Sequence, residues 1–123
     1  MSLSLLTSLL IGIVALEHLY ILYLETIATS SEKTSKTFGV STQQLKEPTI
    51  NVLLKNQGVY NGMLALGLLY TLFFASAPIE MAAVLLSIIV VVALYGGFTS
   101  SKSIILKQGG PAILALLSLI LFK

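Results

Sequence analysis

The chain has 123 residues, of which 56% are hydrophobic and 10% charged, and its formal net charge is +2 at pH 7. Soluble domains carry about 45 to 50% apolar and about 25% charged residues, so this composition argues against a soluble globular protein and for a single domain in membrane lipid. The chain has no Cys, Trp, Arg or Asp, one His and seven scattered Lys, which argues against disulfides, a metal site and a nucleic-acid partner. We expect neither a metal nor a cofactor.

A nearly uninterrupted apolar run over residues 3–25 is the first predicted membrane span. At the helical rise it extends about 34 Å, which exceeds the hydrocarbon thickness of about 30 Å. No lysine precedes Glu17, and the run is longer than the apolar centre of a signal peptide. We therefore predict a transmembrane helix that is retained in the mature protein.

A polar linker follows over residues 28–51, and such a segment cannot lie in hydrocarbon. The later predicted spans cover about residues 56–75, 79–98 and 101–122. Residues 111–122 alone are too short to cross, so we predict that the fourth helix begins near Ser101 and is kinked at Pro111. The predicted fold is an all-α integral membrane protein, a four-transmembrane-helix bundle with a long linker between helices 1 and 2.

The lysines predict the orientation of the chain in the cell membrane. They flank the first linker and lie near the third connection, whereas the opposite side carries the terminal lysine alone (Lys33, Lys36, Lys46 and Lys55; Lys102 and Lys107; Lys123). Positively charged loops stay in the cytoplasm. The 28–51 linker is therefore predicted to be cytoplasmic and both termini to be outside.

Polar residues within the predicted spans are candidates for ligand binding, because ionisable groups in lipid are costly and mark functional sites by default. On the first helix, His18 and Glu25 lie close to a face of small residues, whereas Glu17 points about 100° away from His18. On the second helix, three polar residues share a face: Gln57, Tyr60 and Asn61. Beside it lies a stripe formed by Gly58 and Gly62, which would hold the first and second helices close together. We predict that five of the candidates converge on one cavity, open toward the cytoplasmic half: His18, Glu25, Gln57, Tyr60 and Asn61. Gln108 is a further ligand-binding candidate.

Several of these residues also have a structural explanation. Glu25 lies near a helix end and could pair with Lys55 or Lys107, and His18 could be a packing residue with a local hydrogen bond. Gln57 and Asn61 could join helices by hydrogen bonds, which contribute about 0.6 kcal/mol each on average. The sequence leaves both explanations open.

The polar and glycine positions resemble a known family. The carriers are His18 and Glu25 in HLYILYLE, the string NQGVYNGMLA over residues 56–65, Tyr95-Gly96-Gly97 with Thr99, and Gln108 with Pro111-Ala112. In these strings the chain resembles the small four-span membrane proteins known as domain of unknown function 1304. The resemblance covers nearly the whole chain, and it implies the architecture but no reaction.

Two functions fit these observations. The first is a membrane-embedded polar pocket that binds or transforms a small lipophilic or amphipathic molecule, with His18 as proton donor or acceptor. The alternative is a non-catalytic packing module or a small proton-coupled transport subunit, with Glu25 as the titrating carboxylate. No catalytic residue is assigned, and whether the protein is an enzyme stays open. The expected partners are membrane lipid and further copies of the chain, in a dimer or trimer that uses small-residue stripes such as Ala93 and Gly97.

Overall fold

The computed structural model describes residues 2–99 and 108–122. The described residues form helices and no strand. In chain order the elements are α1 (Leu5–Leu22), the π-helix η1 (Tyr23–Ile27), α2 (Glu32–Phe38), α3 (Thr42–Lys46), α4 (Pro48–Phe73), α5 (Pro78–Thr99) and α7 (Gly110–Phe122). Two continuous helical segments, Leu5–Ile27 and Pro78–Thr99, are long and apolar enough to cross a membrane by length and composition, and Gly110–Phe122 is a shorter apolar helix.

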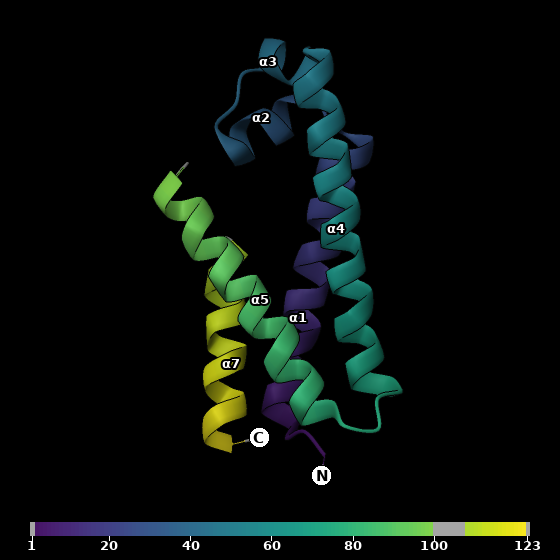
Figure 1. Ribbon diagram of the computed structural model, residues 1–123, viewed down its shortest axis with the longest axis vertical. Coiled ribbons are helices and arrows are strands. Elements are labelled where there is room, and N and C mark those ends of the chain that lie inside the picture. Colours follow the sequence, from purple (N-terminus) through teal and green to yellow (C-terminus); the bar gives the residue numbers. More distant parts are fainter. Residues whose placement is uncertain (1, 100–107, 123) are drawn as a thin grey trace.

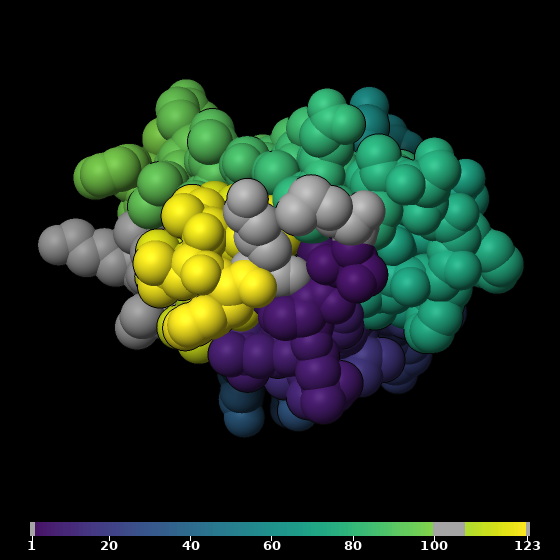
Figure 2. All heavy atoms as spheres, turned by 90° about the horizontal axis from the view of Figure 1, so that it is seen from below, coloured from purple at the N-terminus to yellow at the C-terminus, as the bar shows by residue number. Residues whose placement is uncertain are grey.

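The four long helices lie side by side, with α1 in contact with α4 and α7, and α5 also in contact with α4 and α7. Both termini lie at the same end of the molecule, whereas α2 and α3 lie at the opposite end (Figure 1). Figure 2 views the end that carries the termini, where α7 lies between α1 and α5. The helices therefore pack in the cyclic order α1, α4, α5, α7.

The segment predicted as a polar linker contains two short helices, α2 and α3. Ser31 caps the N-terminus of α2, and Gly39 ends that helix with a positive φ of 69°, which favours glycine. A capping box between Ser41 and Gln44 begins α3. The second long helix begins at Pro48 rather than near 56, because the Glu47 side chain accepts hydrogen bonds from the first free backbone amides and proline is tolerated in the first turn. The linker is thus shorter and more ordered than predicted.

The predicted start of the fourth helix, near Ser101, lies outside the described residues, as does Lys107. Gln108 and Gly109 have π-helical geometry directly before α7, and Pro111 lies in the first turn of α7. A proline in the first turn of a helix removes no intrahelical hydrogen bond.

The core lies where the long helices meet around α1. Its buried apolar residues come from all four helices: Ile11, Val14 and Ala15; Leu68; Ala82, Leu86 and Ile89; Ala112, Ala115 and Leu119. A Cβ added at Gly58 would lie 2.6 Å from Thr26 Cγ2, and one at Gly62 would lie 3.0 Å from Leu22 Cδ2. Real Cβ contacts are not as short as the first of these, so the glycine stripe allows α4 to lie against α1 and η1, as predicted from the sequence.

The small-residue stripe of α5 is used within the chain. Ala93 and Gly97 are buried, and a Cβ at Gly109 would lie 3.0 Å from the Cβ of Ala93. Ala93 therefore packs against the segment before α7 within the chain, and self-association through this stripe stays a prediction.

Large apolar side chains are exposed on each of the long helices, among them Leu5, Phe73, Val91, Phe98 and Phe122. In the most apolar stretch of Leu5–Ile27, 33% is buried inside the protein, and in that of Pro78–Thr99, 28% is buried. The core helix of a soluble protein would be mostly buried, and soluble monomers rarely expose contiguous apolar surface on this scale. The outer surface of the long helices is therefore apolar.

Candidate ligand-binding site

Glu25 and Asn61, two of the residues predicted to line one cavity, are in direct contact. Glu25 lies in η1 and is 4% exposed, Asn61 lies in α4 and is 5% exposed, and Asn61 Nδ2 donates a hydrogen bond to Glu25 Oε1 at 2.7 Å. Lys55 Nζ instead donates to Asn51 Oδ1 at 2.8 Å. The alternative of a Glu25–Lys55 ion pair is therefore wrong, and a pair with Lys107 concerns a residue outside the described range.

The π-helix that carries Glu25 is held by threonine side chains. Thr29 Oγ1 donates to the Glu25 carbonyl oxygen at 2.7 Å. Thr34 Oγ1, from α2, lies 3.0 Å from the Leu24 carbonyl oxygen and 2.7 Å from that of Ala28. These hydroxyl groups satisfy carbonyls at the helix end that would otherwise have no partner. The first turn of α2 is thereby fixed against the end of α1 and η1.

His18 is fully buried and hydrogen-bonded to its own helix. Its Nδ1 lies 2.9 Å from the Val14 carbonyl oxygen. A carbonyl oxygen can only accept, so Nδ1 carries the proton of this bond. Nε2 has no hydrogen-bond partner in the described part of the chain. This local bond is the one expected of a packing histidine.

Gln57 and Tyr60 lie apart from Glu25 and His18. Tyr60 is 68% exposed, and with Gln57 and Asn61 it lines an outward hollow whose far wall includes Ile88 and Val92 of α5. Gln57 and Tyr60 are about 40° and 100° from Asn61 around the helix, on the side opposite Gly58 and Gly62. The prediction that all five residues line one cavity is therefore wrong, because Asn61 marks the boundary between two faces of α4.

Gln108, the sixth candidate, lines a different cavity of about 360 Å³. Its walls come from α1 and η1, from α2, and from the residue before α7: Glu17, Tyr20, Ile21 and Leu24; Lys33, Thr37 and Phe38; Gln108. Small-molecule sites span about 300 to 1,000 Å³ and combine mainly apolar walls with a few polar groups. The cavity has this composition.

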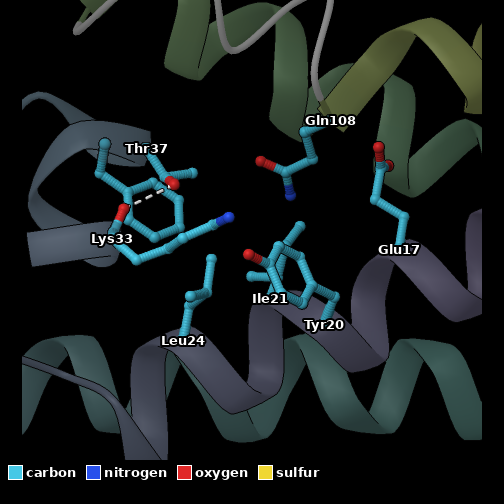
Figure 3. Close-up of a pocket in the computed structure, with 8 residues that line it drawn as sticks. Glu17, Tyr20, Ile21, Leu24, Lys33, Thr37 and Gln108 are labelled. Atoms are coloured by element: carbon cyan, nitrogen blue, oxygen red, sulfur yellow. Dashed lines mark hydrogen bonds between the residues drawn. The ribbon is translucent and has the colours of Figure 1, made fainter. Parts of the chain in front are cut away.

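The polar groups of the cavity lie at different points around it (Figure 3). Lys33 extends its ammonium group into the space between Tyr20 and Gln108, whereas Glu17 lies on the side away from Lys33. Glu17 Oε1 is buried and has no hydrogen-bond partner within the described residues. A buried carboxyl oxygen without a donor costs free energy. A donor group on a bound molecule would remove this cost.

Sequence reasoning missed most of this cavity. Glu17 is not among the predicted candidates, because it points about 100° away from His18, and that offset places it on the face of α1 that lines this cavity. Glu17, Tyr20, Ile21 and Leu24 follow helical spacing and share one face of the first helix, so an ionisable residue on this second stripe was a detectable signal. The wall from Lys33 to Phe38 gave no such signal, because only the folded linker brings it there.

No metal-binding group of three or more His, Cys, Asp or Glu side chains occurs within residues 2–99 and 108–122. The chemistry available in the cavity is that of one carboxyl, one ammonium, one phenol and one amide group, together with the Thr37 hydroxyl, which donates to the Lys33 carbonyl oxygen at 2.7 Å. This set can hold a molecule by hydrogen bonds and charge.

Residues 12–120 match the family described as "Protein of unknown function (DUF1304)". The chain is also similar to the "Uncharacterized protein YpaA" of Lactococcus lactis subsp. lactis (strain IL1403), with 53% identity over 115 residues, which cover 94% of this chain and 97% of that protein. No solved structure matches the chain. The family match spans most of the sequence and includes both helices that meet at Glu25 and Asn61, so the chain belongs to the DUF1304 family.

Proposed function

We propose that this protein is a multi-pass membrane protein that binds a small amphipathic molecule in the cavity between α1, α2 and the start of α7. The observation that carries the proposal is the cavity itself, a space lined by Glu17, Lys33 and Gln108 together with apolar side chains. Binding rather than catalysis is what this set of groups supports.

The membrane assignment is supported by the apolar outer surface. Lipid would cover the exposed side chains of the long helices, and α4, with 26 residues, is about 39 Å long. The shared end of the two termini is what an even number of crossings requires (Figure 1). We propose four spans, with the α2–α3 end in the cytoplasm and both termini outside.

Cysteine labelling tests the topology, because the chain has no native cysteine. Ser35→Cys lies in α2, and Ser76→Cys lies in the connection between α4 and α5. In intact cells, a membrane-impermeant maleimide should label the position-76 variant and not the position-35 variant. Labelling of the position-35 variant alone would show that the proposed orientation is inverted.

We further propose that copies of the chain associate in the membrane through the open side of α1. Ser8 and Gly12 line a groove with Leu69 and Phe73 of α4, and a Cβ added at Gly12 would meet nothing within 4 Å. Small residues on an open face allow close approach of another helix in lipid. Cross-linking in nanodiscs should give dimers or trimers that Gly12→Leu weakens, and a monomer at all concentrations would contradict self-association.

Native mass spectrometry of the protein released from its own membranes tests ligand binding. The Gln108 side chain projects into the cavity (Figure 3), so Gln108→Trp would fill the space, whereas Leu114→Trp adds the same bulk on the exposed side of α7. The wild type and the Leu114 variant should carry the same small extra mass, and the Gln108 variant should lack it. Bare protein in all three samples would contradict the proposed function.

A further inference from the structure

The cavity has one acidic side chain, Glu17, and one basic side chain, Lys33, on different sides of a largely apolar space (Figure 3). We propose that its ligand is a short two-ended zwitterion, with an ammonium group at Glu17, an acid group at Lys33 and a hydrocarbon segment between them. This inference rests on the proposed function, since it names the class of molecule that the same cavity binds.

The Glu17 end calls for a donor on the ligand. An ionised carboxylate only accepts hydrogen bonds, and Glu17 Oε1 is buried without a partner among the described residues. An ammonium group supplies both the missing hydrogen bond and the opposite charge, and charge-assisted hydrogen bonds are about twice as strong as neutral ones. An anionic or purely apolar ligand would leave this oxygen without a partner.

The Lys33 end calls for an acceptor. Lys33 reaches into the cavity between Tyr20 and Gln108 (Figure 3), and its ammonium group has donors but no acceptor. A ligand that carried an ammonium group alone would leave Lys33 unmatched. A ligand with both charges matches both groups and brings no net charge into the cavity, which lowers the cost of desolvation.

The size and floor of the cavity limit what joins the two charges. Ile21 and Leu24 contribute apolar side chains to the floor (Figure 3), and Phe38 adds a further apolar wall. The volume of about 360 Å³ is near the lower end for small-molecule sites. A short hydrocarbon segment fits this space, whereas a two-chain phospholipid does not.

The ammonium end and the acid end of the ligand should contribute differently to its binding affinity. Lys33 is exposed, and ion pairs at exposed lysines are weak because water already solvates the charge. Glu17 is partly buried, so water screens its contact with a ligand less than it screens that of Lys33. The ammonium end should therefore dominate affinity, and the acid end should add selectivity.

Calorimetric titration of the protein in phosphatidylcholine nanodiscs tests the inference, with empty nanodiscs as the blank. The probes are 4-aminobutanoate, 6-aminohexanoate and 8-aminooctanoate, together with hexylamine and hexanoate, which carry one charge each. We expect the best of the three amino acids to bind most tightly, hexylamine next and hexanoate last. The length of the best amino acid reports the separation of the two poles.

Substitutions at Glu17 and Lys33, with matched controls, test which residue binds which end of the ligand. Glu17→Gln should weaken the amino acids and hexylamine by about tenfold or more and leave hexanoate unchanged, because a charged hydrogen bond is lost. Lys33→Gln should weaken the amino acids by a few fold and leave hexylamine unchanged. Glu32→Gln and Lys36→Gln, in α2 but outside the cavity lining, should change none of them.

The outcomes separate the inference from the proposed function. If the wild type carries a cavity-dependent mass but binds hexanoate as tightly as the amino acids, or binds no probe at all, the zwitterion class is wrong and the binding site stands. If no probe binds and no mass is carried, both are wrong. Equal weakening by Glu17→Gln and Glu32→Gln would also overturn the assignment of the ammonium end.

Discussion

Two glutamates about two turns apart on the same helical segment, Glu17 and Glu25, have different surroundings. Glu25 meets an amide donor from α4 at 2.7 Å, whereas Glu17 Oε1 is buried with no partner among the described residues. A polar group whose hydrogen bonds are satisfied inside a protein fixes the position of one helix against another. A polar group that is buried and unsatisfied raises the free energy of the folded state unless a ligand completes it. We therefore assign Glu25 to packing and Glu17 to binding.

The packing of α4 against the segment that carries Glu25 depends first on the glycines of α4. Gly58→Val would place a Cβ 2.6 Å from Thr26 Cγ2 and 3.0 Å from Glu25 Cβ, and should cost about 2 to 3 kcal/mol of unfolding free energy through overpacking. Unfolding in mixed micelles measures this. Gly12→Ala, where a Cβ meets nothing within 4 Å, is the control and should be neutral or stabilising by less than about 1 kcal/mol. Equal losses in both variants would show that the close approach of α4 to η1 is unimportant.

Asn61→Leu tests the hydrogen bond to Glu25, because it removes the donor and leaves Glu25 buried without its partner. We expect a loss of about 1 to 2 kcal/mol in the free energy of unfolding. Adding Glu25→Leu to this variant should recover part of the loss, since both partners are then apolar. A double variant that is as unstable as the sum of the two single variants would mean that the side chains are not coupled.

A smaller effect is expected at the other end of α1. Thr7 Oγ1 and Ser118 Oγ of α7 lie 2.7 Å apart in a buried hydrogen bond. Ser118→Ala should cost about 0.6 kcal/mol, the average for such bonds between helices in lipid. The same unfolding assay measures it, and the change should vanish in a Thr7→Val background. An unchanged cost in that background would assign the effect to lost packing volume.

The sequence was sufficient to predict the helical class and the apolar runs, and it placed Glu25 near Asn61. Apolar length reports a helix directly, and helical spacing places Gly58 and Asn61 on neighbouring faces. The connection between α4 and α5, just before Pro78, also lies where the predicted turn places it.

The cavity could not be predicted in full, for physical reasons that particular residues illustrate. Tyr60 and Glu25 are both polar and near one boundary, yet helical rotation turns Tyr60 outward and Glu25 inward. The position of Lys33 depends on the Thr34 hydrogen bonds to Leu24 and Ala28, which are long-range features of the folded linker. A π-helix such as η1 also shifts the helical register, and no simple sequence pattern marks where that happens.

The unfolding free energies of Glu17→Leu and Glu25→Leu, measured side by side in one micelle composition, test the central claim most directly. Both substitutions remove one carboxyl group from the same helical segment, so changes in lipid transfer affect both in the same direction. We expect Glu17→Leu to be neutral or stabilising, because it removes an unpartnered polar group, and Glu25→Leu to cost about 1 to 2 kcal/mol, because it leaves Asn61 without its acceptor. An equal or larger loss in Glu17→Leu would contradict the assignment of Glu17 to binding.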